Sequence, residues 1–282
     1  MNSESFFPDN MNIKKYIKDN KLEEILKFDD SEENNKNLET FLENNKSCVD
    51  PNWEQQPMLP PDFKDLARLH YLVLSRKVLT ILEFGLGRSS IVFGEALKIN
   101  KNKFFNKINN KIRRKNLFEC YSVENNKNWI ESCKDIIPKE LINQKFINIH
   151  QTNITIGTFS DRICTFYDSI PNICPDLIYL DGPDQYSPKG DIRGISTKHP
   201  DRMPMSGDIL AIEHFLNPGT LIVVDGRGAN ARFLRSNLQR NWEYAYFENF
   251  DQHFFELVEP PLGSINKQII DFTLGTSFYE NL

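Results

Sequence analysis

The feature that most constrains this fold is a series of short, apolar, β-rich runs from Val78 onward, separated by helical stretches. Alternation of this kind is typical of βαβ units, in which helices connect neighbouring parallel strands. It predicts a three-layer α/β fold with a mostly parallel sheet. The predicted strands span residues 79–84, 118–124, 146–151, 177–181 and 220–225.

Helices are predicted between these strands, and an antiparallel pair of strands is predicted at the C-terminal end of the chain. Helical spacing of apolar residues covers about 89–99, 128–137, 207–216 and 229–239. Two further β-like runs, 243–247 and 269–274, predict an antiparallel hairpin at the edge of the sheet. An Asn/Lys-rich stretch at 101–116 is predicted to be a surface loop.

The N-terminal quarter has a different character. Up to about residue 52 it is polar, with Ile13, Tyr16 and Ile17, and then Leu22, Ile25 and Leu26, at the spacing of short amphipathic helices. Prolines at 51–61 predict a linker, and a stronger helix follows at 62–75. We therefore expect a helical extension over residues 1–75 and the α/β domain over 76–282.

Composition excludes several classes of protein. The 282 residues include 34 Lys+Arg against 39 Asp+Glu, a net charge of −5, which argues against nucleic-acid binding. Five scattered cysteines without a C-x-x-C pair favour neither disulfides nor zinc. No secretory signal and no apolar run of about 18 residues is visible, so a cytoplasmic protein without a membrane span is expected.

A glycine turn follows the first predicted strand, in Glu83-Phe84-Gly85-Leu86-Gly87-Arg88-Ser89. Glycines let a ligand approach the backbone, and the helix expected from about Ser89 offers unpaired N–H groups. The acid before the glycines, and Ser90 where dinucleotide folds place a third glycine, suit a cationic ligand better than a pyrophosphate. Plain packing of a strand on a helix is the alternative explanation.

This stretch resembles the first motif of class I S-adenosylmethionine-dependent methyltransferases, in which an acid and a G-x-G turn surround the methionine part of the cofactor. The resemblance extends over about 79–274 and implies a Rossmann-like fold. It implies cofactor contacts at Glu83, Gly85, Gly87 and Ser89.

An acid also ends the second strand, at Glu124, followed by Asn125, and the resemblance implies cofactor contacts at both. A carboxylate there can accept hydrogen bonds from both ribose hydroxyls. The alternative is an acid that favours the dipole of the next helix. After the third strand, the resemblance places Thr152 and Asn153 beside the adenine, although an ordinary polar loop fits as well.

The fourth and fifth strands each deliver an aspartate, Asp181 and Asp225. Cation-dependent small-molecule O-methyltransferases place acids at these two strand ends, and the resemblance implies a role for Asp181 in catalysis and in cofactor binding. Two carboxylates could hold Mg²⁺, but the further ligand that follows in those enzymes is replaced by Gly226. The alternative is that Asp181 acts alone and that Asp225 pairs with Arg227 or Arg232.

Residues 182–206 form a long polar segment without periodicity, which indicates a lid, a binding loop or disorder. His199 is a candidate general base because its ordinary pKa is near 6.5, although a surface histidine is the simpler explanation. Arg227, directly after the fifth strand, is a further candidate catalytic residue, because it could hold a carboxylate or a phosphate.

The resemblance implies a methyltransferase, and by analogy of fold it acts on a hydroxyl of a small polar acceptor, such as a sugar, a polysaccharide or a metabolite. The alternatives are an NAD-dependent oxidoreductase or nucleotide-sugar enzyme, and a binding protein that keeps the fold without catalysis. The N-terminal extension could cap the cofactor or build a homodimer contact.

Overall fold

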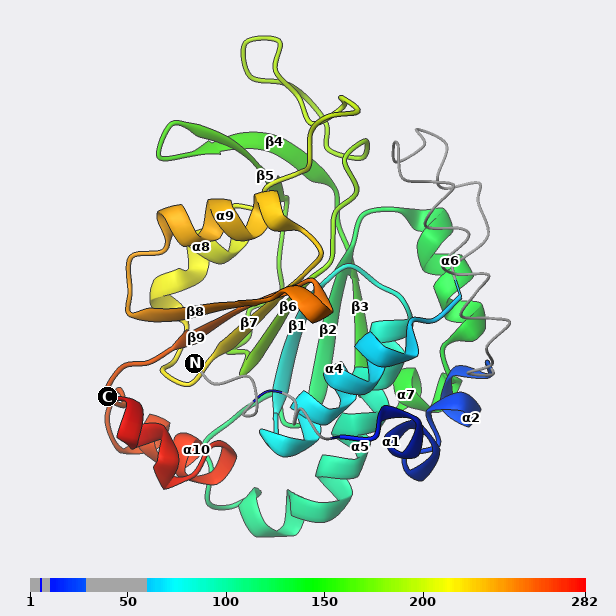
Figure 1. The fold of residues 1–282 in the computed structure, drawn as a ribbon, viewed down its shortest axis with the longest axis vertical. Coiled ribbons are helices and arrows are strands. Elements are labelled where there is room, and N and C mark those ends of the chain that lie inside the picture. The colour runs from blue at the N-terminus through cyan, green and yellow to red at the C-terminus, as the bar shows by residue number, and fades with distance from the viewer. Residues whose placement is uncertain (1–5, 7–10, 29–59) are drawn as a thin grey trace.

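The predicted strands form the centre of one seven-stranded sheet in the order β3-β2-β1-β6-β7-β9-β8 (Figure 1). The computed structural model describes Phe6, residues 11–28 and residues 60–282. All neighbouring pairs from β3 to β7 are parallel, and β9 runs antiparallel to both β7 and β8. The strands are β1 (Thr80–Phe84), β2 (Glu119–Glu124), β3 (Ile147–Gln151), β6 (Leu177–Leu180), β7 (Leu221–Asp225), β8 (Trp242–Phe247) and β9 (Gln252–Leu257).

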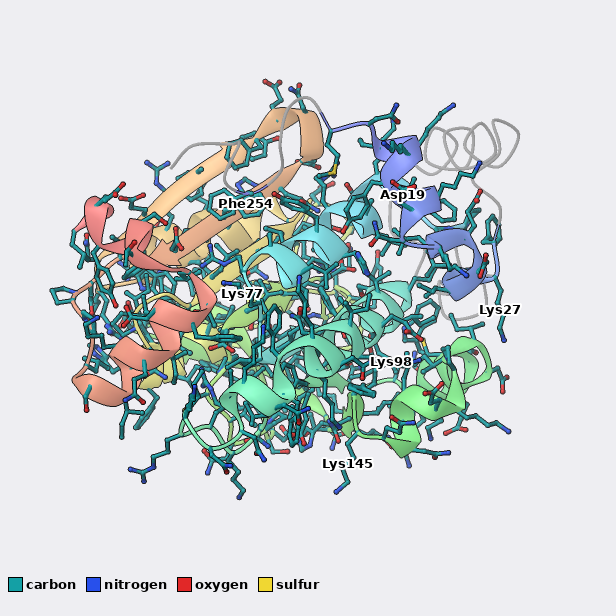
Figure 2. The ribbon with its side chains drawn as sticks, turned by 90° about the horizontal axis from the view of Figure 1, so that it is seen from below. Asp19, Lys27, Lys77, Lys98, Lys145 and Phe254 are labelled. Atoms are coloured by element: carbon teal, nitrogen blue, oxygen red, sulfur yellow. The ribbon has the colours of Figure 1, made fainter. Side chains whose placement is uncertain are left out.

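Alternation along each strand divides the hydrophobic core between the two faces of the sheet. Ile81 belongs to a cluster that α4, α5 and α6 complete, whereas Leu82 belongs to a cluster with residues of α8 and α9. Figure 2 shows the first of these helical layers from below, with α4 and α5 lying across the sheet. The mostly parallel, three-layer fold with an antiparallel strand near the C-terminus is therefore confirmed.

The helices cover both faces of the sheet. They are α1 (Ile13–Asp19), α2 (Leu22–Leu26), α4 (Phe63–Ser75), α5 (Arg88–Ile108), α6 (Lys127–Ile136), α7 (Lys139–Asn143), α8 (Asp208–Ile212), α9 (Gly228–Asn237) and α10 (Ser264–Thr273), with short 3₁₀-helices η3 (Glu213–Phe215), η4 (Glu248–Phe250) and η5 (Thr276–Asn281). In the part of the chain that the structure describes, no helix is both long and apolar enough to cross a bilayer.

Two predicted segments were wrong. The stretch 101–116 is not a loop throughout, because α5 continues to Ile108 and buries Phe104 and Ile108, which are one turn apart. The run 269–274 lies in α10, where Ile269, Ile270 and Thr273 are buried at helical spacing. The partner of β8 is instead β9, which is not among the strands predicted from the sequence.

A hairpin of β4 (Ile154–Phe159) and β5 (Arg162–Tyr167) also went unpredicted. Ser160 and Asp161 both have positive φ, as a tight two-residue hairpin turn requires. The hairpin rises above the sheet at the top of Figure 1. The 182–206 segment is attached to it, because the N–H of Ile156 donates to the Lys189 carbonyl (2.9 Å) and that of Thr165 to the Met205 carbonyl (2.8 Å).

The N-terminal part packs onto the α/β layers. The two predicted short helices are α1 and α2, and Leu22 and Leu26 are buried in the same cluster as α5. Most of the predicted linker at 50–61 lies outside the described residues. The boundary at residue 75 stays a prediction.

Candidate functional site

Most of the predicted site residues lie where the parallel strands β1, β2, β6 and β7 end, on the edge of the sheet below the β4–β5 hairpin (Figure 1). Open α/β sheets bind their ligands at this edge, where the strand order changes direction. Here β1 lies between β2 and β6, so the glycine turn after β1 lies beside the segments that follow both neighbours.

The two glycines of the turn have different tasks. Gly85 adopts φ +120°, which L side chains rarely do, and its N–H donates to the Val123 carbonyl at 2.9 Å. Gly87 is in extended backbone (φ −179°), and a Cβ added there would meet no atom within 4 Å. The first glycine is therefore required by the turn, and the second leaves open space beside it.

Glu83 stabilises the glycine turn through hydrogen bonds to its carboxylate. Only 1% of its surface is exposed, and its carboxylate accepts hydrogen bonds from the hydroxyls of Ser89 (2.5 Å), Ser90 (2.6 Å) and Ser122. Burial raises the pKa of Glu83 to about 7, against the effect of the three hydroxyls. These contacts connect β1 to β2 and to the start of α5. The geometry thus supports a positioning role for Glu83 and Ser89, and direct cofactor contact by either stays a prediction.

Glu124 presents its carboxylate differently. Its Oε1 accepts hydrogen bonds from the backbone N–H groups of Asn125 (2.7 Å) and Asn126 (2.9 Å), whereas no described residue donates to Oε2. The residue is 9% exposed, and this burial raises the pKa of Glu124 to about 7; the two N–H groups oppose the shift, and the charges of Asp184 and Glu83 add to it. One oxygen is therefore fixed, and the other is left for a donor.

The end of the third strand is connected to Glu124 through the backbone, because the N–H of Thr152 donates to the Glu124 carbonyl at 3.1 Å. The Thr152 hydroxyl accepts from Ser169 at 3.2 Å, and Asn153, which is exposed, accepts from the Lys189 ammonium at 3.2 Å. These polar groups lie at the rim of the site. Their contact with a base stays a prediction.

Asp181 and Arg227 form a pair after β6 and β7. The guanidinium donates to the carbonyls of Pro183 (2.8 Å) and Asp181 (2.5 Å) and lies 3.5 Å from Oδ1 of Asp181. The Asp181 side chain remains half exposed, yet the surrounding protein desolvates it and raises its pKa to about 6; Arg227 opposes this shift and Asp225 adds to it. Arg227 therefore fixes the turn that carries Asp181.

Asp225 is hydrogen-bonded to uncharged side chains and not to Arg227. It accepts hydrogen bonds from the Tyr179 hydroxyl and from the Gln252 amide, both at 2.9 Å, and burial raises its pKa. Within residues 11–28 and 60–282, no three His, Cys, Asp or Glu side chains group as metal ligands. With Arg227 beside one aspartate and two protein donors on the other, the pair does not fit Mg²⁺, which prefers several oxygen ligands.

His199 lies on the long segment between β6 and α8, and its side chain is half-buried. Its Nδ1 accepts from the N–H of Asp201 (3.2 Å), and its carbonyl accepts from the Gln185 amide (2.9 Å). Both partners belong to the same segment, so these contacts do not connect His199 to Asp181. A catalytic role for His199 stays a prediction.

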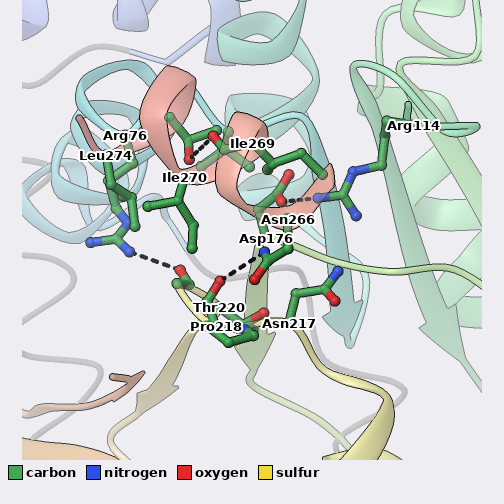
Figure 3. A pocket seen from close by; sticks show the side chains of 13 residues that line it. Arg76, Arg114, Asp176, Asn217, Pro218, Thr220, Asn266, Ile269, Ile270 and Leu274 are labelled. Atoms are coloured by element: carbon green, nitrogen blue, oxygen red, sulfur yellow. Dashed lines mark hydrogen bonds and ion pairs between the residues drawn. The ribbon is translucent and has the colours of Figure 1, made fainter. Parts of the chain in front are cut away.

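A pocket lined by both polar and apolar residues lies at the opposite end of the strands, where β1, β6 and β7 begin (Figure 3). There Arg114 pairs with Asp176, and Asp176 also accepts from the N–H groups of Leu79 and Thr80, both at 3.0 Å. Arg76 donates to the Gly219 carbonyl at 3.1 Å. These polar groups connect strands to one another, so this pocket is part of the framework.

Sequence reasoning missed Tyr167 and Asp208. The Asp208 carboxylate, 4% exposed, accepts from the Tyr167 N–H (3.2 Å) and from the Ser206 hydroxyl (3.0 Å). Burial raises the pKa of Asp208 to about 7. An acid at the start of a helix was the available signal, but only recognition of the hairpin would have connected it to Tyr167.

Comparison with known proteins gives only distant likenesses. No protein-family model and no curated protein matches the chain. A proposed O-methyltransferase from Klebsiella pneumoniae is similar over 79% of this chain and 90% of its own, at 15% identity and a TM-score of 0.39. The O-methyltransferase TomG from Streptomyces achromogenes, involved in tomaymycin synthesis and solved with SAM, matches over 89% and 100% at 15% identity and a TM-score of 0.39.

An O-methyltransferase from Bacillus cereus, solved with SAH, matches over 88% of this chain and 100% of its own, at 11% identity and a TM-score of 0.38. Similarity at this level carries no conclusion about activity. The function has to be argued from the residues of the site.

Proposed function

We propose that this protein is an S-adenosylmethionine-dependent methyltransferase that methylates a hydroxyl of a small polar acceptor, such as a sugar or another metabolite. The observation that carries the proposal is Glu124. Its carboxylate stands at the end of β2, next to the glycine turn, with one oxygen fixed by two backbone N–H groups and the other without a protein donor. A pair of ribose hydroxyls supplies the missing donors.

The charge of the site also favours this ligand. Several acids lie close together, since the negative charge of Asp181 adds to the raised pKa of Glu83, and the charges of Asp184 and Glu83 add to that of Glu124. Such a site attracts the sulfonium and ammonium groups of S-adenosylmethionine and repels the pyrophosphate of NAD. The open space beside Gly87 leaves room for the amino-acid part of the ligand.

When bound, S-adenosylmethionine supplies a methyl group that an acceptor oxygen can take in an in-line displacement. The protein then has to orient the acceptor hydroxyl and receive its proton. Asp181 suits this task, because its carboxylate is half exposed and its pKa of about 6 leaves it mostly deprotonated at neutral pH. Arg227 keeps the Asp181 turn in place through two carbonyl groups.

Titration calorimetry tests the proposal with S-adenosylmethionine, S-adenosylhomocysteine and NADH. We expect both adenosyl ligands to bind and NADH to give no heat. Glu124→Ala should weaken binding at least about thirtyfold, since about 2 kcal/mol of charge-assisted hydrogen bonding is lost. The matched control is Glu131→Ala, an exposed acid on α6 that pairs with Lys134, and it should bind as the wild type does. Binding of NADH alone would favour the oxidoreductase alternative.

A further inference from the structure

Tyr167, the last residue of β5, holds a buried hydroxyl that nothing in the described structure uses. The side chain is 5% exposed, and its ring stacks on Phe84 at a centroid distance of 5.8 Å. Its backbone N–H donates to Asp208 at 3.2 Å. The hydroxyl oxygen, by contrast, is inaccessible to solvent and has no hydrogen-bond partner among the described residues.

An unpaired buried hydroxyl is unfavourable for folding. Buried polar groups are nearly always paired, and an exception indicates a functional role or a missing partner. A phenylalanine at position 167 would stack on Phe84 equally well without this penalty. The hydroxyl therefore points to a partner that arrives with a ligand.

The surroundings of Tyr167 locate that partner. Besides Asp208, the charges that act on its hydroxyl are those of Glu124 at the end of β2, Asp184 after β6 and Arg227 after β7. Because the Tyr167 ring stacks on Phe84, the last residue of β1, the side chain lies at the end of the strand between β2 and β6, on the side of the sheet where these charged residues lie. Burial and the nearby carboxylates raise the pKa of Tyr167 well above its ordinary value, so the group stays protonated and can donate.

We infer that Tyr167 is a ligand-binding residue of the nucleoside site, and that its hydroxyl donates a hydrogen bond to the adenosine part of the bound ligand between Glu124 and Arg227. This inference rests on the proposed function. The contact requires the groups that cover the hydroxyl to move aside as the ligand enters. It makes the β4–β5 hairpin, which carries Tyr167, a part of the binding site.

The variant Tyr167→Phe tests this with two readouts on the full chain. Titration with S-adenosylhomocysteine and with adenosine should show affinities about five- to twentyfold weaker for both, the effect of one lost hydrogen bond. The denaturant midpoint of the ligand-free variant should be equal to or above that of the wild type. The control is Tyr244→Phe on β8, whose hydroxyl lies 2.9 Å from Nδ1 of His253. This control should lose stability and keep its affinity.

The outcomes separate the inference from the proposed function. If the wild type binds S-adenosylhomocysteine and Tyr167→Phe binds it equally well, the inference is wrong and the proposed function stands. If Tyr167→Phe loses stability as Tyr244→Phe does, the hydroxyl has a protein partner, and the inference is again wrong. If the wild type binds neither probe, both fall.

Discussion

Ligand binding should depend on pH through Glu124, because its ligand-free pKa of about 7 lies well above its ordinary 4.5. Ribose hydroxyls that donate to the carboxylate stabilise the charged form and lower this pKa, so binding releases a proton. Linkage then requires the affinity to rise with pH. The affinity changes most at pH values between the pKa of Glu124 in the ligand-bound protein and its pKa in the ligand-free protein.

The size of the effect follows from these two values. A return of the pKa from about 7 to its ordinary 4.5 corresponds to about 3 kcal/mol at most, at 1.36 kcal/mol for each pH unit. Between pH 5.5 and pH 8, this makes S-adenosylhomocysteine bind about thirtyfold more tightly at the higher pH. Most of the change falls below pH 7.

Calorimetric titration across this range, in two buffers with different ionisation heats, measures both the affinity and the proton released. Glu124→Gln removes the titrating group, and the remaining slope reports Glu83 and Asp181, which titrate in the same window. The reasoning is refuted if the wild-type affinity is flat or falls with pH. It is also refuted if Glu124→Gln keeps the full wild-type slope.

Three further predictions follow from the site. The raised pKa of Glu83, about 7, favours its protonated form in the folded protein, so this group's contribution to stability is full below pH 4.5 and is lost as the pH rises through 7. In urea unfolding, Glu83→Gln should therefore show a smaller drop in the free energy of unfolding from pH 5 to pH 8 than the wild type shows. An equal drop in both proteins contradicts this. Gly85→Ala should lower the free energy of unfolding by about 1–2 kcal/mol because φ is +120° there, whereas Gly87→Val should be as stable as the wild type but lose S-adenosylhomocysteine binding. Normal binding by Gly87→Val would contradict the placement of the ligand beside Gly87. Asp181→Asn should slow the transfer of radiolabelled methyl groups into the small-molecule fraction of a cell extract by about 10²–10⁴-fold, and an unchanged rate contradicts the role of Asp181. The wild-type rate should fall as the pH drops through about 6 and should be unaffected by EDTA.

The parallel part of the sheet can be predicted from the sequence, because its central strands β1, β6 and β7 are buried on both faces and form nearly continuous apolar runs. All five predicted parallel strands are present, from Thr80–Phe84 to Leu221–Asp225. The antiparallel edge of the sheet was harder to predict. The run 269–274 has β-rich composition, but its burial pattern is helical, and only packing against the sheet decides between the two. The β4–β5 hairpin lacked the Asn-Gly type of turn that signals such structures.

For the site, the sequence predicts which side chains meet but not how they are used. Strand ends alone bring Glu124, Asp181 and Arg227 to one edge. That Glu83 is fully engaged by serine hydroxyls depends on a residue of β2, Ser122, 39 positions away. The pairing of Arg227 with Asp181 depends likewise on two separate strand ends, which no local pattern encodes.

A crystal structure of the protein with S-adenosylhomocysteine tests the central claim most directly. The account predicts both ribose hydroxyls within hydrogen-bond distance of the Glu124 carboxylate and the homocysteine part beside Gly87. A ligand found elsewhere on the molecule, or no occupancy at millimolar concentration, would contradict it.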